Sequence, residues 1–306
     1  MRSHIVMALV AAAFIGCSGE DGATGPQGPQ GPMGPQGPAG EDGTDWPGPV
    51  PQAYVDADGI TGGAAFSKWW TIDGGGSGTA PSTAASSEFY RCKSCHAWDG
   101  LGSAGSYANR TGQSTGNLGR PDVAAVNLRS AVYAESYQEL YNLVSHAGAR
   151  DIDAVDNTHP DYADFLSEDQ IWDLVKFMRE EWVNPSDLYD LAVSGPAMRW
   201  DYSVNPAVLV SPTLTYTNIG ALGNESNGQT LYASACAVCH GIDGTQLPIG
   251  GISVGRFIRT KPYEAWFKIK FGEPGTGMAP GLVTATSDLQ DLYAALANTT
   301  NFPEMP

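Results

Sequence analysis

The stretch Cys236-Ala237-Val238-Cys239-His240 decides how this chain folds, and it has a counterpart in Cys92-Lys93-Ser94-Cys95-His96. The pattern Cys-x-x-Cys-His is typical of covalent attachment of a c-type haem. Two thiols one helical turn apart can each bond a haem vinyl group, and the adjacent histidine then lies beneath the iron. A lone Cys-x-x-Cys could be a redox dithiol or half of a zinc site. The appended histidine and the duplication favour two covalent haems c, with His96 and His240 as proximal iron ligands.

Composition limits the partners of the chain and the way it is stabilised. Its 306 residues allow roughly two domains. It carries 33 acidic against 16 basic residues, a formal charge of -17. This balance argues against nucleic acid as a partner, because phosphate binding needs a basic face, and it would suit basic redox partner proteins. Only Cys17 lies outside the two motifs, so we expect haem burial, and no disulfide, to stabilise each domain.

The N-terminus predicts export. Arg2 is followed by an apolar run from Ile5 to Ile15 that is too short to span a bilayer, so residues 1–16 fit a signal peptide. Phe14-Ile15-Gly16-Cys17 resembles a bacterial lipobox, in which Cys17 is lipidated, although Phe14 replaces the usual leucine. The alternative is ordinary signal cleavage nearby, with Cys17 free or lost. We expect a protein anchored by lipid to a bacterial membrane and facing the periplasm or the cell exterior.

A collagen-like pattern fills most of residues 17–50. Glycine occupies every third position from Gly19 to Gly43, with proline after five of these glycines. Strict Gly-X-Y is required in a collagen triple helix because only glycine fits at its axis. The segment therefore predicts a stalk, which either trimerises through residues 19–45 or stays a monomeric, extended polyproline II chain.

Residues 51–184 are predicted to form the first haem domain. Its cytochrome unit is expected to begin near Glu88, and the tryptophans of an apolar island at 64–70 are expected to pack on it. An amphipathic helix is indicated by apolar residues at helical spacing, and a second helix opens with a capping box of Ser167 and Gln170. The buried positions of the two helices are Tyr137, Leu140, Tyr141 and Val144, and then Ile171, Leu174, Val175 and Met178.

Residues 225–306 repeat this order in shorter form, after a connector at residues 185–224 with one short strand at 214–217. Ser287 and Gln290 predict a second capping box. The repeated apolar positions are Tyr263, Trp266 and Phe267, and then Leu289, Leu292, Tyr293 and Leu296. The predicted fold class is all-α, with two helical domains each wrapped around one covalently attached haem.

Residues 226–298 resemble a class I cytochrome c domain. The resemblance is carried by Gly228-Gln229-Thr230-Leu231-Tyr232, the haem motif with Gly241, and Gly277-Met278-Ala279-Pro280. Residues 88–182 resemble a more divergent member. The resemblance implies electron transfer, a proximal histidine from each motif and a distal methionine downstream. It also implies that a proline carbonyl orients the proximal histidine, for which Pro121 and Pro248 are candidates.

The two domains differ in the expected sixth ligand of the iron. Met278 lies in a glycine-rich, polar loop, a poor place for a core methionine, and is the predicted ligand of the second haem. The first domain has no methionine between its motif and Ser167. His159, eight residues before Ser167 and next to a proline, takes the corresponding place. His146 or an open iron remain alternatives, whereas Met178 fits the core.

These ligands favour an electron carrier over an enzyme. Methionine ligation raises a haem potential, so the first haem is expected to have the lower potential. The alternatives are a dihaem peroxidase, which needs an open iron, or a cytochrome subunit of a larger oxidoreductase or surface assembly. Three scarce cations, Arg120, Lys268 and Lys270, could pair with haem propionates or lie solvated on the surface.

Overall fold

The computed structural model describes residues 48–72, 90–108, 127–145, 159–197 and 199–305. The signal peptide, Cys17, the Gly-X-Y segment, Arg120, Pro121 and His146 lie outside these ranges. Residues 44–306 form one compact unit, separate from residues 1–43, and only the former is described below. Within the described ranges, no helix combines the length and the apolar character needed to cross a membrane.

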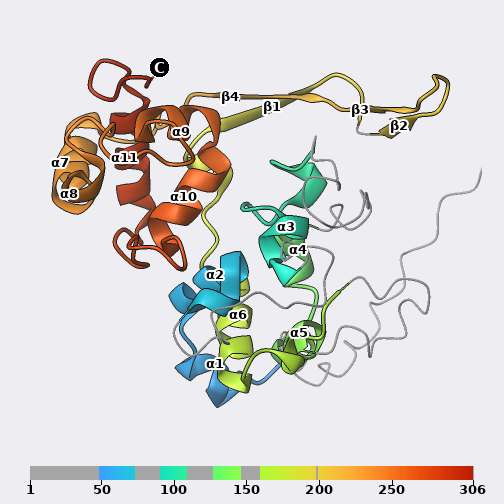
Figure 1. Ribbon diagram of the computed structural model, residues 1–306. Helices are drawn as coiled ribbons and strands as arrows, with labels where there is room; N and C mark the ends of the chain where they lie inside the picture. Colours follow the sequence, from blue (N-terminus) through green and yellow to red (C-terminus); the bar gives the residue numbers. More distant parts are fainter. Residues whose placement is uncertain (1–47, 73–89, 109–126, 146–158, 198, 306) are drawn as a thin grey trace, which may run out of the picture. The chain divides into compact units, whose positions relative to one another are not determined.

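The first haem half, residues 48–184, contains the helices that the sequence predicts (Figure 1). The capping box is confirmed, because the Ser167 side chain accepts from the Gln170 backbone while the Gln170 side chain accepts from the Ser167 backbone. Met178 is buried, as expected for a core residue. The helices are α1 (Gln52–Asp56), α2 (Gly59–Lys68), α3 (Cys92–His96), α4 (Leu128–Ala131), α5 (Tyr137–Ser145) and α6 (Glu168–Glu180).

The second half, residues 225–305, repeats a helix before the motif and one at its end. The predicted Ser287–Gln290 capping box is wrong. The last helix begins at Thr286 with Ala285 as its N-cap and no side-chain cap, so Ser287 already lies in the first turn. The helices are α7 (Glu225–Ala235), α8 (Ala237–His240), α9 (Val254–Thr260), α10 (Pro262–Phe271) and α11 (Thr286–Ala297).

The two halves share one helix crossing. α2 packs on α6 as α7 packs on α11. At each crossing a glycine touches the partner backbone: a Cβ on Gly62 would lie 1.9 Å from the Asp173 carbonyl oxygen, and one on Gly228 would lie 1.8 Å from that of Asp291. The same aspartates accept, through their side chains, the backbone N–H of the helix N-cap residues, Asp58 and Asn224, both at 2.6 Å. The duplication inferred from the haem motifs therefore extends to the helices that enclose them.

The predicted apolar island at 64–70 takes part in this crossing. It forms the end of α2 and the turn after it, and α2, which precedes the expected start of the cytochrome unit near Glu88, is the counterpart of α7. Trp69 and Trp70 are buried, and the Trp69 indole donates to the Tyr90 carbonyl at 3.1 Å. The prediction that the tryptophans pack on the first haem half is confirmed.

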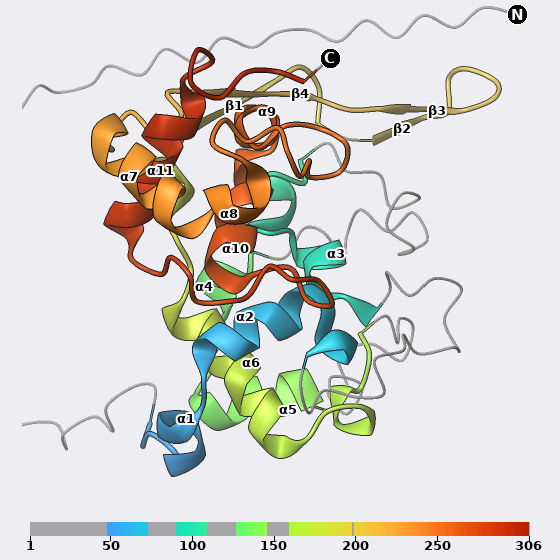
Figure 2. The same cartoon turned by 60° about the vertical axis from the view of Figure 1, so that its left-hand side comes forward.

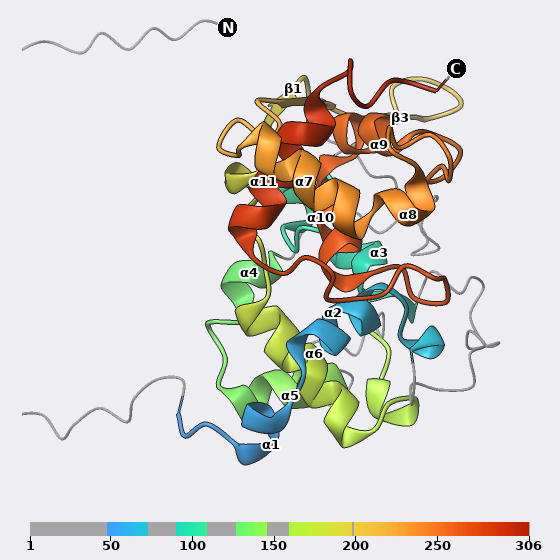
Figure 3. The same cartoon turned by 90° about the vertical axis from the view of Figure 1, so that its left-hand side faces the viewer.

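α2 also contacts the second half. It lies between α6 and α10 (Figures 2 and 3). Gly63 meets the Phe271 ring, which a Cβ would approach to 2.2 Å, and Phe66 packs on both Phe177 of α6 and Phe267 of α10. Lys270 of α10 bonds both the side chain and the carbonyl of Glu181, which caps α6. The aromatic core is therefore continuous between the two halves.

The connector departs from the all-α prediction. It forms two antiparallel ribbons, β1 (Asp190–Ser194) with β4 (Thr213–Thr217) and β2 (Arg199–Asp201) with β3 (Val208–Val210). The strand expected at 214–217 is confirmed as β4. The first ribbon is held at its base, where Tyr216 packs on Tyr189 and on Tyr263 of α10. The fold is thus helical around the haem motifs, with a small β element between the halves.

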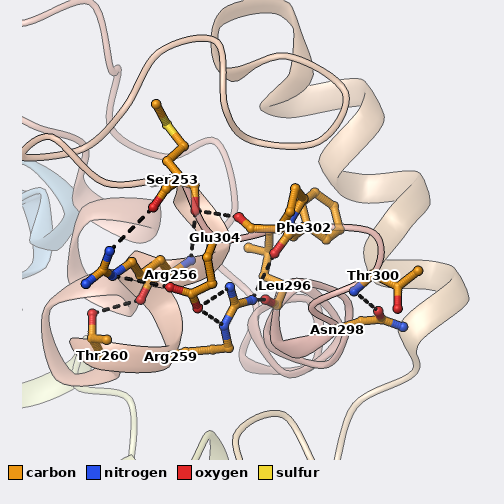
Figure 4. A network of polar contacts seen from close by, with 11 residues as sticks. Ser253, Arg256, Arg259, Thr260, Leu296, Asn298, Thr300, Phe302 and Glu304 are labelled. Atoms are coloured by element: carbon orange, nitrogen blue, oxygen red, sulfur yellow. Dashed lines mark hydrogen bonds and ion pairs between the residues drawn. The ribbon is translucent and has the colours of Figure 1, made fainter.

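The C-terminal segment fixes α9 in place (Figure 4). Glu304 pairs with Arg256 at 3.3 Å and with Arg259 at 2.8 Å. Arg259 also donates to the carbonyl of Phe302 at 3.1 Å, and Ser253, the N-cap of α9, donates to the Pro303 carbonyl at 2.7 Å. α9 supplies one wall of the pocket described next, so these contacts set the width of that pocket.

Candidate functional site

A cavity in the second half brings together three of the predicted site residues. Cys236, His240 and Met278 all line it, and it encloses about 430 Å³, part of which is open to solvent. Ligand pockets are likewise mostly apolar with few polar groups. The remaining wall is nearly all apolar and includes Tyr232, Ile249, Val254, Phe257, Ile258 and Leu292. A flat, apolar group held by Cys236 and ligated by His240 and Met278 fits this lining.

The ring of His240 is oriented by a neighbouring carbonyl. Its Nδ1 donates to the Leu247 carbonyl at 2.7 Å, which fixes the ring orientation and leaves Nε2 to bind a metal. The expected acceptor was Pro248, and the structure corrects this by one residue. Leu247 immediately precedes that proline, and the Gln246 N–H bonds the His240 carbonyl at 2.9 Å, which turns the chain back at this point.

Met278 is held beside the cavity by a loop that folds back onto α10. The Glu273 N–H donates to the Met278 carbonyl at 3.0 Å, and the Gly281 N–H donates to the Lys270 carbonyl at 2.9 Å. Gly272 has a φ of +70°, and a Cβ there would lie 2.4 Å from the Met278 carbonyl oxygen. Only glycine suits this conformation at such a close approach. The loop therefore fixes where the thioether can reach.

The first motif forms α3, which is more deeply buried than the second motif. The Cys92 thiol donates to the Tyr162 hydroxyl at 3.6 Å, and Tyr162 donates to the Tyr90 carbonyl at 3.1 Å. Burial raises the pKa of Cys92 to about 11 and, in the second motif, that of Cys236 to about 11. Both thiols are thus protonated and uncharged near neutral pH, as their apolar surroundings require.

His159 lies near His96, as a pair of axial ligands would. Burial and, to a smaller extent, the charge of nearby His159 lower the pKa of His96 to about 3. Burial also lowers the pKa of His159, whose Nδ1 donates to the Pro160 carbonyl at 2.9 Å, leaving Nε2 available. The Nδ1 atom of His96 is buried and has no hydrogen-bond partner among the described residues. Both imidazoles are thus buried and favour the neutral form, which is the form that binds a metal.

The comparisons with known proteins bear on the first half. Residues 83–182 match the family model for Cytochrome c. No curated protein and no solved structure matches the chain. The matched residues contain α3 to α6, His96 and His159, so this cytochrome c domain supports covalently bound haem c and haem-based electron transfer.

The candidate propionate partners have clear positions. Lys268 lines the second cavity and pairs with Glu264 at 3.5 Å and with Glu273. Burial lowers its pKa. Lys270 is engaged by Glu181 across the two halves, so its role is to join them. Arg120 falls outside the described residues.

Three residues of the site escaped the sequence reasoning. Leu247 acts through its carbonyl, which no side-chain pattern reveals. Tyr162 contacts both the Cys92 thiol and the His159 ring, whose centroid is 5.6 Å away; its position shortly after His159 was the available signal. Trp98, two residues after His96, packs on Phe267 of the second half at 4.8 Å between ring centroids.

Proposed function

We propose that this protein is an exported dihaem c-type cytochrome that carries single electrons in the cell envelope or at the cell surface. One observation carries the proposal. Two Cys-x-x-Cys-His helices lie in one compact unit, and each has a further ligand candidate beside it, His159 near His96 and Met278 in the same cavity as His240.

The residues of the two sites would divide the work as follows. The paired cysteines would hold each haem by thioether bonds, and the four axial side chains would close both irons to small substrates. A bound haem supplies an iron that alternates between Fe(II) and Fe(III). His96 with His159 would give the lower potential and His240 with Met278 the higher, because methionine ligation raises it. Electrons would then run from the first site to the second.

Exposure supports the second site as the place of exchange with a partner. Val238, inside the second motif, is 81% exposed, and Ile242, just after it, is 85% exposed. The corresponding part of the first motif is buried at Lys93 and Ser94. A partner protein would therefore reach the second haem more directly than the first.

Export and anchoring rest on the sequence. A short signal segment followed by Cys17, and then the Gly-X-Y pattern, support a lipid anchor and a stalk that raises the haem halves from the membrane. Replacement of Cys17 by serine should abolish incorporation of labelled fatty acid and release the protein from membranes. Sedimentation of the protein with and without residues 18–50 tests the trimer, since a single monomer mass for both would exclude it.

A haem count with spectroscopy tests the carrier function. A pyridine haemochrome assay should give two haems per chain, and EPR of the oxidised protein should show one bis-histidine and one histidine–methionine low-spin signal. His159→Ala should convert only the first haem to high spin, whereas Met178→Leu, a buried core substitution, should change neither signal. A high-spin haem in the wild-type protein, together with rapid peroxide turnover after half-reduction, would instead favour a dihaem peroxidase.

A further inference from the structure

α10 forms the wall between the second cavity and the first half. Three of its residues, Ala265, Lys268 and Ile269, line the cavity. On its other side, Phe267 and Phe271 enter the aromatic core that continues into the first half, where both contact Phe177. A side chain near the first motif that touches Phe267 is therefore next to Lys268, which lines the second cavity.

Trp98 makes that contact. It lies two residues after His96, is 4% exposed, and packs on Phe267 with 4.8 Å between ring centroids. The ammonium nitrogen of Lys268, which itself lines the second cavity, lies 5.4 Å from the centroid of the same indole. A continuous path of bonded and packed atoms therefore leads from His96 through Ala97 and Trp98 to the wall of the second cavity.

Two cations lie over this indole. Besides Lys268, the ammonium of Lys93 lies 5.2 Å from the ring centroid, and both lysines are largely buried. A cation over an aromatic face is attracted by the ring quadrupole. Lys268 is itself paired with Glu264 and Glu273. The two lysines therefore help to hold the indole in place against α10.

We propose that Trp98 is the bridge through which an electron passes between the two haem sites. This inference rests on the proposed function. With both haems bound, one electron would tunnel through the packed ring from Fe(II) at the first site to Fe(III) at the second, so that the first iron would become Fe(III) and the second Fe(II). No bond changes and no proton moves.

The test measures the rate of electron equilibration between the haems after flash reduction of the fully oxidised, full-length protein. Trp98→Leu removes the ring and should slow equilibration by about tenfold or more, because the gap it leaves loses the packing contacts of the path. Trp98→Phe should fall between wild type and the leucine variant. Trp172→Leu is the matched control, since Trp172 is a buried tryptophan of α6 that packs on Tyr54 and Tyr141 of the first half; its rate should equal that of wild type.

Potentials and EPR signals of both haems are recorded for every variant and should not change. Equal rates in the two leucine variants would overturn the bridge. A phenylalanine variant as slow as Trp98→Leu, or an indole radical in the EPR spectrum during transfer, would overturn tunnelling through the packed ring. If Trp98→Leu fails to load both haems, Trp98→Phe against Trp172→Phe decides, and equal rates again overturn the bridge. A wild-type protein with one haem would refute the proposed function instead.

Discussion

The two halves share the same helix crossing and differ in how the helices enclose the Cys-x-x-Cys-His motif. Each has a glycine of one helix set against an aspartate backbone of another, and each ends in a helix with matched buried positions. The surroundings of the two motifs differ in exposure. Ser94 is 1% exposed in the first motif, whereas Val238, at the same motif position, is 81% exposed in the second. Duplication thus preserved the helix crossing while access to the motif diverged.

The divergence extends to the ligands. The second half holds Met278 on a loop that turns at Gly272, and the first half holds His159 beside a buried tyrosine. A thioether has no proton to gain in the ordinary pH range, while an imidazole does. The same helical frame can therefore carry two sites that respond differently to potential and to acid.

The largest expected effect comes from making the ligands alike. Met278→His should lower the potential of the second haem by a few tenths of a volt, within the range of about 0.8 V that axial ligands span. The two waves of a redox titration should then approach each other. Met178→Leu serves as the control, because Met178 is buried in the core of the first half. A titration unchanged by Met278→His would remove Met278 from the ligand set.

The shared helix crossing is tested by adding a methyl group to each half. Gly62→Ala and Gly228→Ala should each lower the free energy of unfolding by about 1–3 kcal/mol or more, as overpacking does, because their Cβ atoms would overlap a backbone carbonyl. Denaturant titration followed by far-UV circular dichroism measures the loss. Gly277→Ala, where no atom lies within 4 Å, should cost far less. A neutral Gly62→Ala beside a costly Gly228→Ala would show that the crossings are not equivalent.

Acid should separate the two haems. Iron binds only the deprotonated imidazole, so falling pH favours a protonated His159 and detachment from the first iron, while Met278 stays bound. Burial lowers the pKa of His159, so ligation should persist below the ordinary histidine pKa of about 6.5. Absorbance and EPR across an acid titration should show the first haem becoming high-spin while the second is still low-spin. The reverse order would contradict the assignment of ligands.

The smallest expected effects concern two tyrosine hydroxyls, one in each half. Tyr162→Phe and Tyr232→Phe should each cost about 1 kcal/mol of unfolding free energy, the usual value of one hydrogen bond. Each carbonyl they serve keeps a second donor: Trp69 for Tyr90, and Gly244 for Gly241. Chemical denaturation at matched haem content measures the difference. A loss of several kcal/mol in the first half alone would show that the Cys92–Tyr162 contact is essential for that site.

Much of the helical fold could be predicted from the sequence, because the apolar periodicity is strong where helices bury one face. The helices at 137–145, 168–180 and 286–297 are of this kind. The cavity with Cys236, His240 and Met278 followed from motif chemistry. The proximity of His159 to His96 followed from comparing positions between halves.

The rest depends on contacts that no local pattern contains. α2 begins with glycines, which lower helix propensity, and it forms because those glycines allow close packing on α6 and α10. The second capping box failed because Ser287 and Gln290 have the right spacing but the wrong place relative to the helix start. Leu247 orients His240 through its backbone carbonyl, which a residue of any type would supply.

The position of α2 decides how this protein can be dissected. It precedes both haem motifs in the chain, yet it packs on helices from either side of the connector. Cleavage at the exposed connector ribbons would leave the carboxyl-terminal fragment without the surface that covers Phe271. A fragment starting just before the first motif would expose the same aromatic cluster from the other side. A fragment that keeps both halves intact therefore has to begin upstream of Gln52, and the halves are best studied by inactivating one Cys-x-x-Cys-His motif within the intact chain.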